Sequence, residues 1–134
     1  MKLQEHEAKE VFAAAGIPVP KSALATDAAG AAQASREIGF PCVLKSQVLR
    51  GGRGKAGLIR LVKSEAEARE VAASLFASEH GVRKILVEEA VDIGREIYLS
   101  ITVDPVASTA LILACAEGGV EIEELAATAP EKIV

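Results

Sequence analysis

The chain has 134 residues, half of them hydrophobic and a quarter charged, which is typical of a globular domain and not of a disordered segment. Its net charge of −4 argues against a general nucleic-acid binder, and no apolar run approaches the roughly 20 residues needed to span a bilayer. The first ten residues, MKLQEHEAKE, are charged and lack the apolar stretch of a signal peptide. We therefore expect a cytoplasmic protein with no membrane and no nucleic-acid partner.

The first predicted helix covers residues 2–15, and Gly16 and the prolines that follow it end the helical pattern. We expect His6 on its solvent-exposed surface. The apolar spacing predicts that the helix turns these side chains inward: Leu3, Val11, Phe12 and Ala15.

The next segments predict a helix, a hairpin and a second helix. Residues 27–38 fit a helix, and residues 41–48 and 57–63 fit two strands joined by a glycine-rich turn. A helix over residues 64–78 begins with the Ser-x-x-Glu pattern of a capping box. The two cysteines of the chain lie far apart in apolar runs, which favours reduced core residues over a disulfide or a metal site.

The last third of the chain is richer in strands. Residues 84–89 fit a strand, and residues 95–104 and 108–115 fit two strands that pair across an Asp-Pro turn. A final helix begins after a Gly-Gly break at 118–119. Hairpins mixed with helices predict an α+β fold with antiparallel strand pairs, and not the regular alternation of a Rossmann fold.

The glycine-rich turn, GGRGKAG at residues 51–57, contains the spacing G-x-G-x-x-G. The dinucleotide-binding fingerprint requires a helix after these glycines, but a strand follows here, and the P-loop pattern does not fit either. Two interpretations stay open. The turn is a flap over nucleotide phosphates, with Lys45 on the preceding strand reaching the same phosphates, or it is an ordinary basic surface turn.

A second candidate binding segment, which is acidic, begins at the end of the predicted strand at 84–89. Glu88 ends this strand together with Glu89, and a short link leads to Glu96. Backbone groups at such a strand end could hydrogen bond an adenine, and a carboxylate beyond it could accept the hydroxyl groups of a ribose. The alternative is an acidic loop between two strands.

Four blocks of the sequence together resemble one family. The residues 1–20, 43–57, 86–99 and 117–124 are similar to the N-terminal part of the β subunit of succinyl-CoA synthetase and its relatives, the ADP-forming acyl-CoA ligases of the ATP-grasp superfamily. The resemblance implies an ATP-grasp-like fold, with a mixed sheet, antiparallel hairpins and packing helices, of which the chain is the N-terminal portion.

The resemblance also implies an organisation of the chain. The helix in residues 1–19 would pack with a second lobe that begins at residues 96–134, and residues 20–95 would form a small lobe with the glycine flap. The nucleotide would bind between the two lobes.

The resemblance assigns nucleotide-binding roles residue by residue, and assigns no catalytic residue and no metal ligand to this chain. Lys45 and a flap of Gly52, Arg53 and Gly54 would contact the phosphates. Glu88 and the backbone through Val91 would form the adenine hinge, and Glu96 would bind the ribose. The cofactors would be ATP or ADP, and Mg²⁺ with ligands outside this chain.

The implied function is nucleotide binding in an ATP-dependent, ADP-forming carboxylate–CoA ligase, such as a succinate–CoA or malate–CoA ligase. Its partner would be an α-type subunit that binds CoA and carries a phosphorylated histidine. Because the magnesium and acyl sites are expected beyond these residues, the chain alone is expected to be inactive. The alternative is a non-catalytic binding or assembly module that docks on an α-type subunit.

Overall fold

The computed structural model describes residues 2–119 and 122–134. The chain divides into two compact units, Met1–Val91 and Asp92–Val134. Each unit combines helices with antiparallel strands, so the predicted α+β class is confirmed. Within the described residues, no helix is long and apolar enough to cross a membrane.

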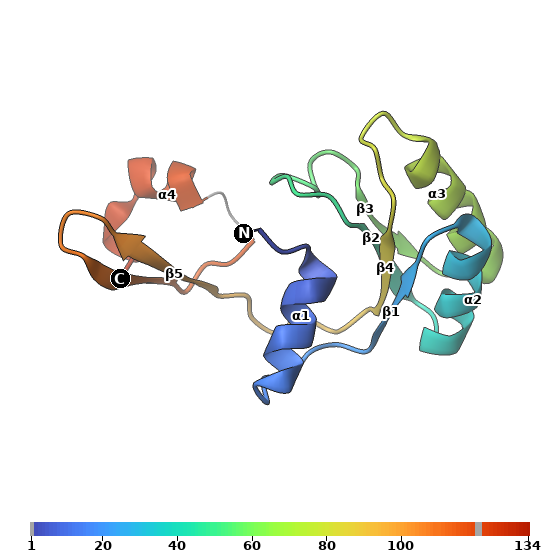
Figure 1. Cartoon of the computed structure of the whole chain (residues 1–134), viewed down its shortest axis with the longest axis horizontal. Coiled ribbons are helices and arrows are strands. Elements are labelled where there is room, and N and C mark those ends of the chain that lie inside the picture. Colours follow the sequence, from blue (N-terminus) through green and yellow to red (C-terminus); the bar gives the residue numbers. More distant parts are fainter. Residues whose placement is uncertain (1, 120–121) are drawn as a thin grey trace. The chain divides into compact units, whose positions relative to one another are not determined.

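The first unit is a four-stranded antiparallel sheet with helices on both faces (Figure 1). The strands follow the order β1-β4-β2-β3, which places β2 and β4 at the centre. Its elements along the chain are α1 (Glu5–Ala14), β1 (Ser22–Ala25), α2 (Ala28–Ile38), β2 (Cys42–Ser46), β3 (Ile59–Val62), α3 (Glu65–Ala77) and β4 (Ile85–Glu89). Only β1, which is four residues long, was not predicted.

The hydrophobic core lies between the sheet and the pair of helices α2 and α3. Alternate residues of the central strands, Leu44 on β2 and Ile85 and Val87 on β4, are fully buried on this face. Alanines face them from the helices, among them Ala31 and Ala68 at 0% exposure. Small side chains let the helices approach the sheet closely. The narrow space between helices and sheet is therefore filled without many aromatic side chains.

Helix α3 begins with side-chain hydrogen bonds that follow the predicted capping box only in part. The Ser64 hydroxyl accepts from the Glu67 backbone N–H at 3.2 Å, as expected. The Glu67 carboxylate reaches one residue further than the pattern predicts and accepts from the backbone N–H of Lys63 at 2.8 Å. The first bond satisfies a free donor in the first turn of the helix, and the second fixes the residue before the N-cap.

Helix α1 lies on the opposite face of the sheet from α2 and α3, and the predicted orientation of its side chains is wrong (Figure 1). His6, which was predicted to be exposed, is buried at 8% exposure. The predicted inward set is exposed instead: Leu3, Val11, Phe12 and Ala15. Hydrogen bonds and ion pairs hold α1 against the sheet, so the spacing of its apolar residues does not show which side of the helix is buried.

The second unit is a two-stranded hairpin followed by a short helix. Strands β5 (Tyr98–Asp104) and β6 (Thr109–Cys115) form an antiparallel pair across the predicted turn, and α4 (Ile122–Thr128) and a 3₁₀ turn (Pro130–Lys132) follow. The Asp104 carboxylate accepts from the backbone N–H groups of Val106 and Ala107 at 2.8 and 3.1 Å, which fixes the turn. The start of the predicted last helix, residues 120–121, lies outside the described residues.

Candidate functional site

Two predicted site residues meet on the sheet face that carries α1. Lys45 on β2 and Glu88 on β4 alternate with the core residues of their strands and so point away from the hydrophobic core. The Lys45 ammonium lies 2.6 Å from Glu88 Oε1. Only 5% of the Glu88 side chain is exposed, so this ion pair is largely shielded from water.

A carboxylate from α1 joins this pair to the glycine-rich loop. Glu5 Oε1 accepts from the Lys45 ammonium at 3.1 Å, and Glu5 Oε2 accepts from Arg53 Nη2 at 2.6 Å. The Arg53 guanidinium also donates from Nη1 to the backbone carbonyl of Ser46 at 3.0 Å, which ties the loop to the end of β2. Lys45 and Arg53, which lie on different elements, thus share one carboxylate.

Lys9 completes the cluster from the next turn of α1. Its ammonium lies 3.4 Å from Glu5 Oε1 and donates a hydrogen bond to Glu88 Oε2. The cluster therefore contains three cations (Lys9, Lys45 and Arg53) and two carboxylates, and carries a net charge of +1. We call these five residues the charged cluster from here on.

The charges of the cluster stabilise one another. Burial would raise the pKa of Glu5, but the hydrogen bond from Arg53 and the charge of Lys45 outweigh it and lower this pKa from 4.5 to about 2. Burial would lower the pKa of Lys45, but hydrogen bonding to Glu88 and the charge of Glu5 outweigh it and raise this pKa. Glu5 and Lys45 are therefore both ionised at neutral pH.

The glycine-rich loop folds back on itself between β2 and β3. Gly52 and Gly57 adopt positive φ angles of +67° and +69°, which glycine tolerates best. The Leu58 N–H donates to the Arg53 carbonyl at 2.9 Å, and the buried Leu58 side chain anchors the loop in the core. Gly54 is different, because its φ is not left-handed and an added Cβ would meet no atom within 4 Å. The fold therefore does not require glycine at position 54.

The structure brings some of the predicted site residues together in the charged cluster. Lys45, Arg53 and Glu88 belong to the charged cluster, and Gly52 and Gly54 flank Arg53 in the loop. Val91 follows β4 with 54% of its surface exposed. Glu96 belongs to the second unit, where its backbone carbonyl accepts from the Gly118 N–H at 3.1 Å.

The sequence interpretation missed Glu5 and Lys9. Their spacing of four residues, glutamate before lysine, is typical of ion pairs on one face of a helix. This signal was present in the sequence, but it could not show that the pair faces the sheet.

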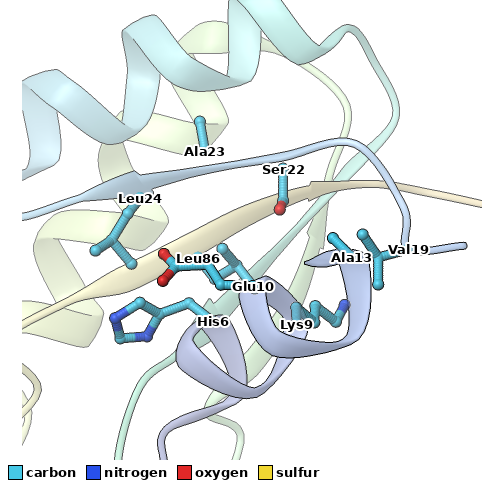
Figure 2. A pocket seen from close by; sticks show the side chains of 9 residues that line it. All are labelled: His6, Lys9, Glu10, Ala13, Val19, Ser22, Ala23, Leu24 and Leu86. Atoms are coloured by element: carbon cyan, nitrogen blue, oxygen red, sulfur yellow. The ribbon is translucent and has the colours of Figure 1, made fainter. Parts of the chain in front are cut away.

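A cavity of about 220 Å³ lies between α1 and the strands β1 and β4, next to the charged cluster. Figure 2 shows Lys9 and Glu10 on the helix side of this cavity, with Ser22 and Leu24 of β1 on the sheet side. Leu86 of β4 also lines it. The cavity thus combines apolar strand side chains with ionic groups from α1.

A metal ion in a protein is typically held by a cluster of His, Cys, Asp or Glu side chains. In residues 2–119 and 122–134, no group of three or more His, Cys, Asp or Glu side chains could hold a metal ion. We assign no Mg²⁺ ligand to the described residues of this chain.

A family model described as an ATP-grasp domain matches residues 2–134, so the chain belongs to the ATP-grasp family. Within that family its sequence is 63% identical, over 134 residues, to subunit SauC of an ADP-forming sulfoacetate-CoA ligase from Bilophila wadsworthia. It is 45% identical over 143 residues to the β subunit of an ADP-forming succinate–CoA ligase from Pelobacter propionicus. The matches cover 100% and 99% of this chain but 36% of each relative. The predicted resemblance to this family is confirmed.

Solved structures agree with this placement. The chain is similar to acetyl-coenzyme A synthetase 1 of Ca. Korarchaeum cryptofilum, solved with coenzyme A, Ca-AMPCP and HgCl⁺, with a TM-score of 0.76 and 31% identity over 90% of this chain and 56% of that one. It is also similar to PH1788 from Pyrococcus horikoshii, with a TM-score of 0.76 and 29% identity over 92% of this chain and 55% of that one. The predicted ATP-grasp-like fold is confirmed.

Proposed function

We propose that the chain is the nucleotide-binding N-terminal portion of the β subunit of an ADP-forming acyl-CoA ligase. The observation that carries the proposal is the position of Lys45 and Arg53. One comes from a central strand and the other from the glycine-rich loop, yet both bind the same carboxylate of Glu5. Two cations that converge on one anion form a suitable site for a phosphate group.

Each residue of the site has a distinct role in this proposal. Lys45 and Arg53 bind the phosphates, and the backbone N–H groups of Gly52 and Gly54 add donors from the loop. The Glu88 carboxylate holds the Lys45 ammonium in place at 2.6 Å. Adenine would bind the backbone beyond β4.

Two residues beyond the cluster complete the nucleotide site as proposed. The backbone after β4, through Val91, lies outside the regular strand and would hydrogen bond the adenine ring, although the Ala90 N–H already donates to the Pro41 carbonyl at 3.4 Å. The Glu96 carboxylate, in the second unit, would accept the ribose hydroxyl groups.

The proposed reaction of the complete protein joins a carboxylate to CoA at the expense of ATP. We propose an α-type partner subunit that binds CoA and carries the phosphorylated histidine, Mg²⁺ held by residues outside this chain, and a cytoplasmic location. Succinate and sulfoacetate, the acids in the names of two relatives, are both short carboxylates with a second anionic group. We propose an acyl substrate of this class, and nucleotide binding without turnover for the 134-residue chain by itself.

One observation favours a second candidate, a non-catalytic module that docks on an α-type subunit. The face of the β5–β6 hairpin formed by Leu99, Ile101, Val103 and Ile112 is apolar, and each of these side chains is more than half exposed. Apolar surface of this kind is typical of interaction sites. In such a docking module, the charged cluster would have no nucleotide to bind.

Calorimetric titration with ATP and ADP separates these functions. We expect the unmodified chain to bind, and Lys45→Ala to weaken the affinity about ten- to a hundredfold, as expected for a lost charge-assisted hydrogen bond. Lys63→Ala, which removes an exposed lysine beyond β3, is the matched control and should leave the affinity unchanged. A chain that is folded by circular dichroism but binds no nucleotide would contradict the proposal and favour the docking module.

A further inference from the structure

The two carboxylates of the charged cluster differ in accessibility. Glu88 lies within a central strand, with 5% of its side chain exposed, and bonds both Lys9 and Lys45. Glu5 lies in the first turn of α1, and 19% of its side chain is exposed. A ligand from solution can therefore reach Glu5 more easily than Glu88.

Space for a ligand lies beside Glu5. A cavity of about 350 Å³ is lined by both Glu5 and Arg53. Two more cationic side chains, Lys2 and Arg50, contribute to its wall. A cavity with three cations and one carboxylate attracts anions, and the carboxylate is the group that an incoming anion would have to replace.

We propose that Glu5 is an internal substitute for a nucleotide phosphate: its carboxylate occupies Lys45 and Arg53 in the free chain, and a phosphate group displaces it on binding. This inference rests on the proposed function, because it assigns the occupant of that same site. Glu5 uses one oxygen for Lys45 and the other for Arg53, at 3.1 and 2.6 Å. Phosphate oxygens can take over both bonds and bring more negative charge to the same cations.

The exchange changes the net charge that the cluster presents to a phosphate group. With Glu5 in place, the charged cluster carries +1, and once this carboxylate withdraws it carries +2. Glu88 stays bonded to Lys45, so the ammonium keeps its position during the exchange. Glu5 thus holds both phosphate-binding cations in place before the ligand arrives, and it lowers the affinity because it competes for them.

The test compares two substitutions that each remove one negative charge from α1. Glu5→Gln removes the competing carboxylate but keeps the size of the side chain, and Glu10→Gln is the matched control at an exposed position of the same helix. In calorimetric titrations with ADP, we expect Glu5→Gln to bind about three- to tenfold more tightly than the unmodified chain, as expected for a lost competing ion pair. Glu10→Gln should bind like the unmodified chain.

The outcomes separate this inference from the proposed function. If the unmodified chain binds ADP and Glu5→Gln binds equally or more weakly, Glu5 is not a competitor and the inference is wrong. If neither chain binds, the proposed function fails and the inference fails with it. If only Glu5→Gln binds, ADP does not displace Glu5 in the unmodified chain, and the inference is wrong together with the proposed function.

A second measurement needs no substitution and covers the case in which Glu5→Gln fails to fold. A crystal structure of the unmodified chain with ADP should show a phosphate oxygen beside Arg53 and Lys45, with Glu5 no longer bonded to Arg53. A complex in which Glu5 keeps both bonds while a phosphate is bound would overturn the inference.

Discussion

His6 and Gln47 are joined through a single oxygen atom that takes two contacts. The His6 backbone N–H donates to Gln47 Oε1 at 3.0 Å, and the His6 ring nitrogen Nδ1 lies 3.1 Å from the same atom. Because this oxygen can only accept, Nδ1 carries the hydrogen. Gln47 Nε2 in turn donates to the Lys45 carbonyl at 2.9 Å. A buried glutamine thus links α1 to the strand residue at the centre of the candidate site.

We expect Gln47→Leu to destabilise the chain by about 2–3 kcal/mol, because buried donors of His6 and the Lys45 carbonyl lose their partner. Urea unfolding followed by circular dichroism measures this change in the free energy of unfolding. Gln33→Leu is the control, because its hydrogen bond to Glu37 is exposed, and we expect a change within about 0.5 kcal/mol. Equal stability of the two variants would show that the His6–Gln47 link contributes little.

Substitutions at two glycines of the loop should affect different properties, one the stability of the chain and the other its affinity for ADP. Gly57→Ala should destabilise the chain by about 1 kcal/mol, since position 57 has a φ of +69°. Gly54→Ala should leave the stability unchanged, because its Cβ would meet no atom. It should nevertheless weaken ADP binding about three- to tenfold, because the methyl group would keep a phosphate away from the loop backbone.

Thermal unfolding and calorimetric titration of the same two variants provide both readouts. Unchanged ADP affinity in Gly54→Ala would contradict the proposed approach of the loop backbone to the phosphates. A clear loss of stability in Gly54→Ala would instead show that this glycine serves the fold.

The stability of the chain should depend on pH through Glu5. Its pKa is about 2 in the folded chain and 4.5 ordinarily, so the folded state holds its proton less tightly than the unfolded state. The resulting stabilisation is fully present above about pH 4.5 and is lost as the pH falls towards 2. Lys45 has a raised pKa, so its contribution is present below its ordinary value of 10.5 and is lost only at higher pH.

Urea unfolding at pH 7, 5, 4 and 3 tests this dependence. We expect the free energy of unfolding of Glu5→Gln to fall less steeply below pH 4.5 than that of the unmodified chain. Glu10→Gln, at an exposed position, should keep the steeper fall. Identical slopes for the unmodified chain and Glu5→Gln would mean that Glu5 is not held as an anion by Arg53 and Lys45.

Whether an element could be predicted from the sequence depends on whether apolar packing or polar contacts hold it in place. The strands β2 and β3 and the helices α2 and α3 were predictable, because their apolar periodicity reports the one hydrophobic core that they share. The strand β1 has only four residues, one of them buried, which leaves too short a pattern to detect. The buried face of α1 was misread because polar contacts place this helix.

The candidate site shows the same division. Lys45 was singled out as a lysine in an apolar strand, whereas Arg53 and Glu88 received their predicted roles from the resemblance to a known family. Glu5 becomes part of the site only through bonds to residues 40 and 48 positions away. No local pattern carries that information.

The second unit offers a test at Gly118. A Cβ at this position would lie 2.7 Å from the Cβ of Glu96 and 2.9 Å from the Glu96 carbonyl carbon, and backbone atoms cannot move aside cheaply. We expect Gly118→Ala to destabilise this unit by about 1–3 kcal/mol, measured as faster hydrogen exchange in β5 and β6. Gly94→Ala, whose Cβ would meet no atom, is the control and should keep normal exchange. Because Glu96 is the proposed ribose ligand, Gly118→Ala should also weaken ADP binding. Faster exchange with unchanged affinity would remove Glu96 from the proposed nucleotide site.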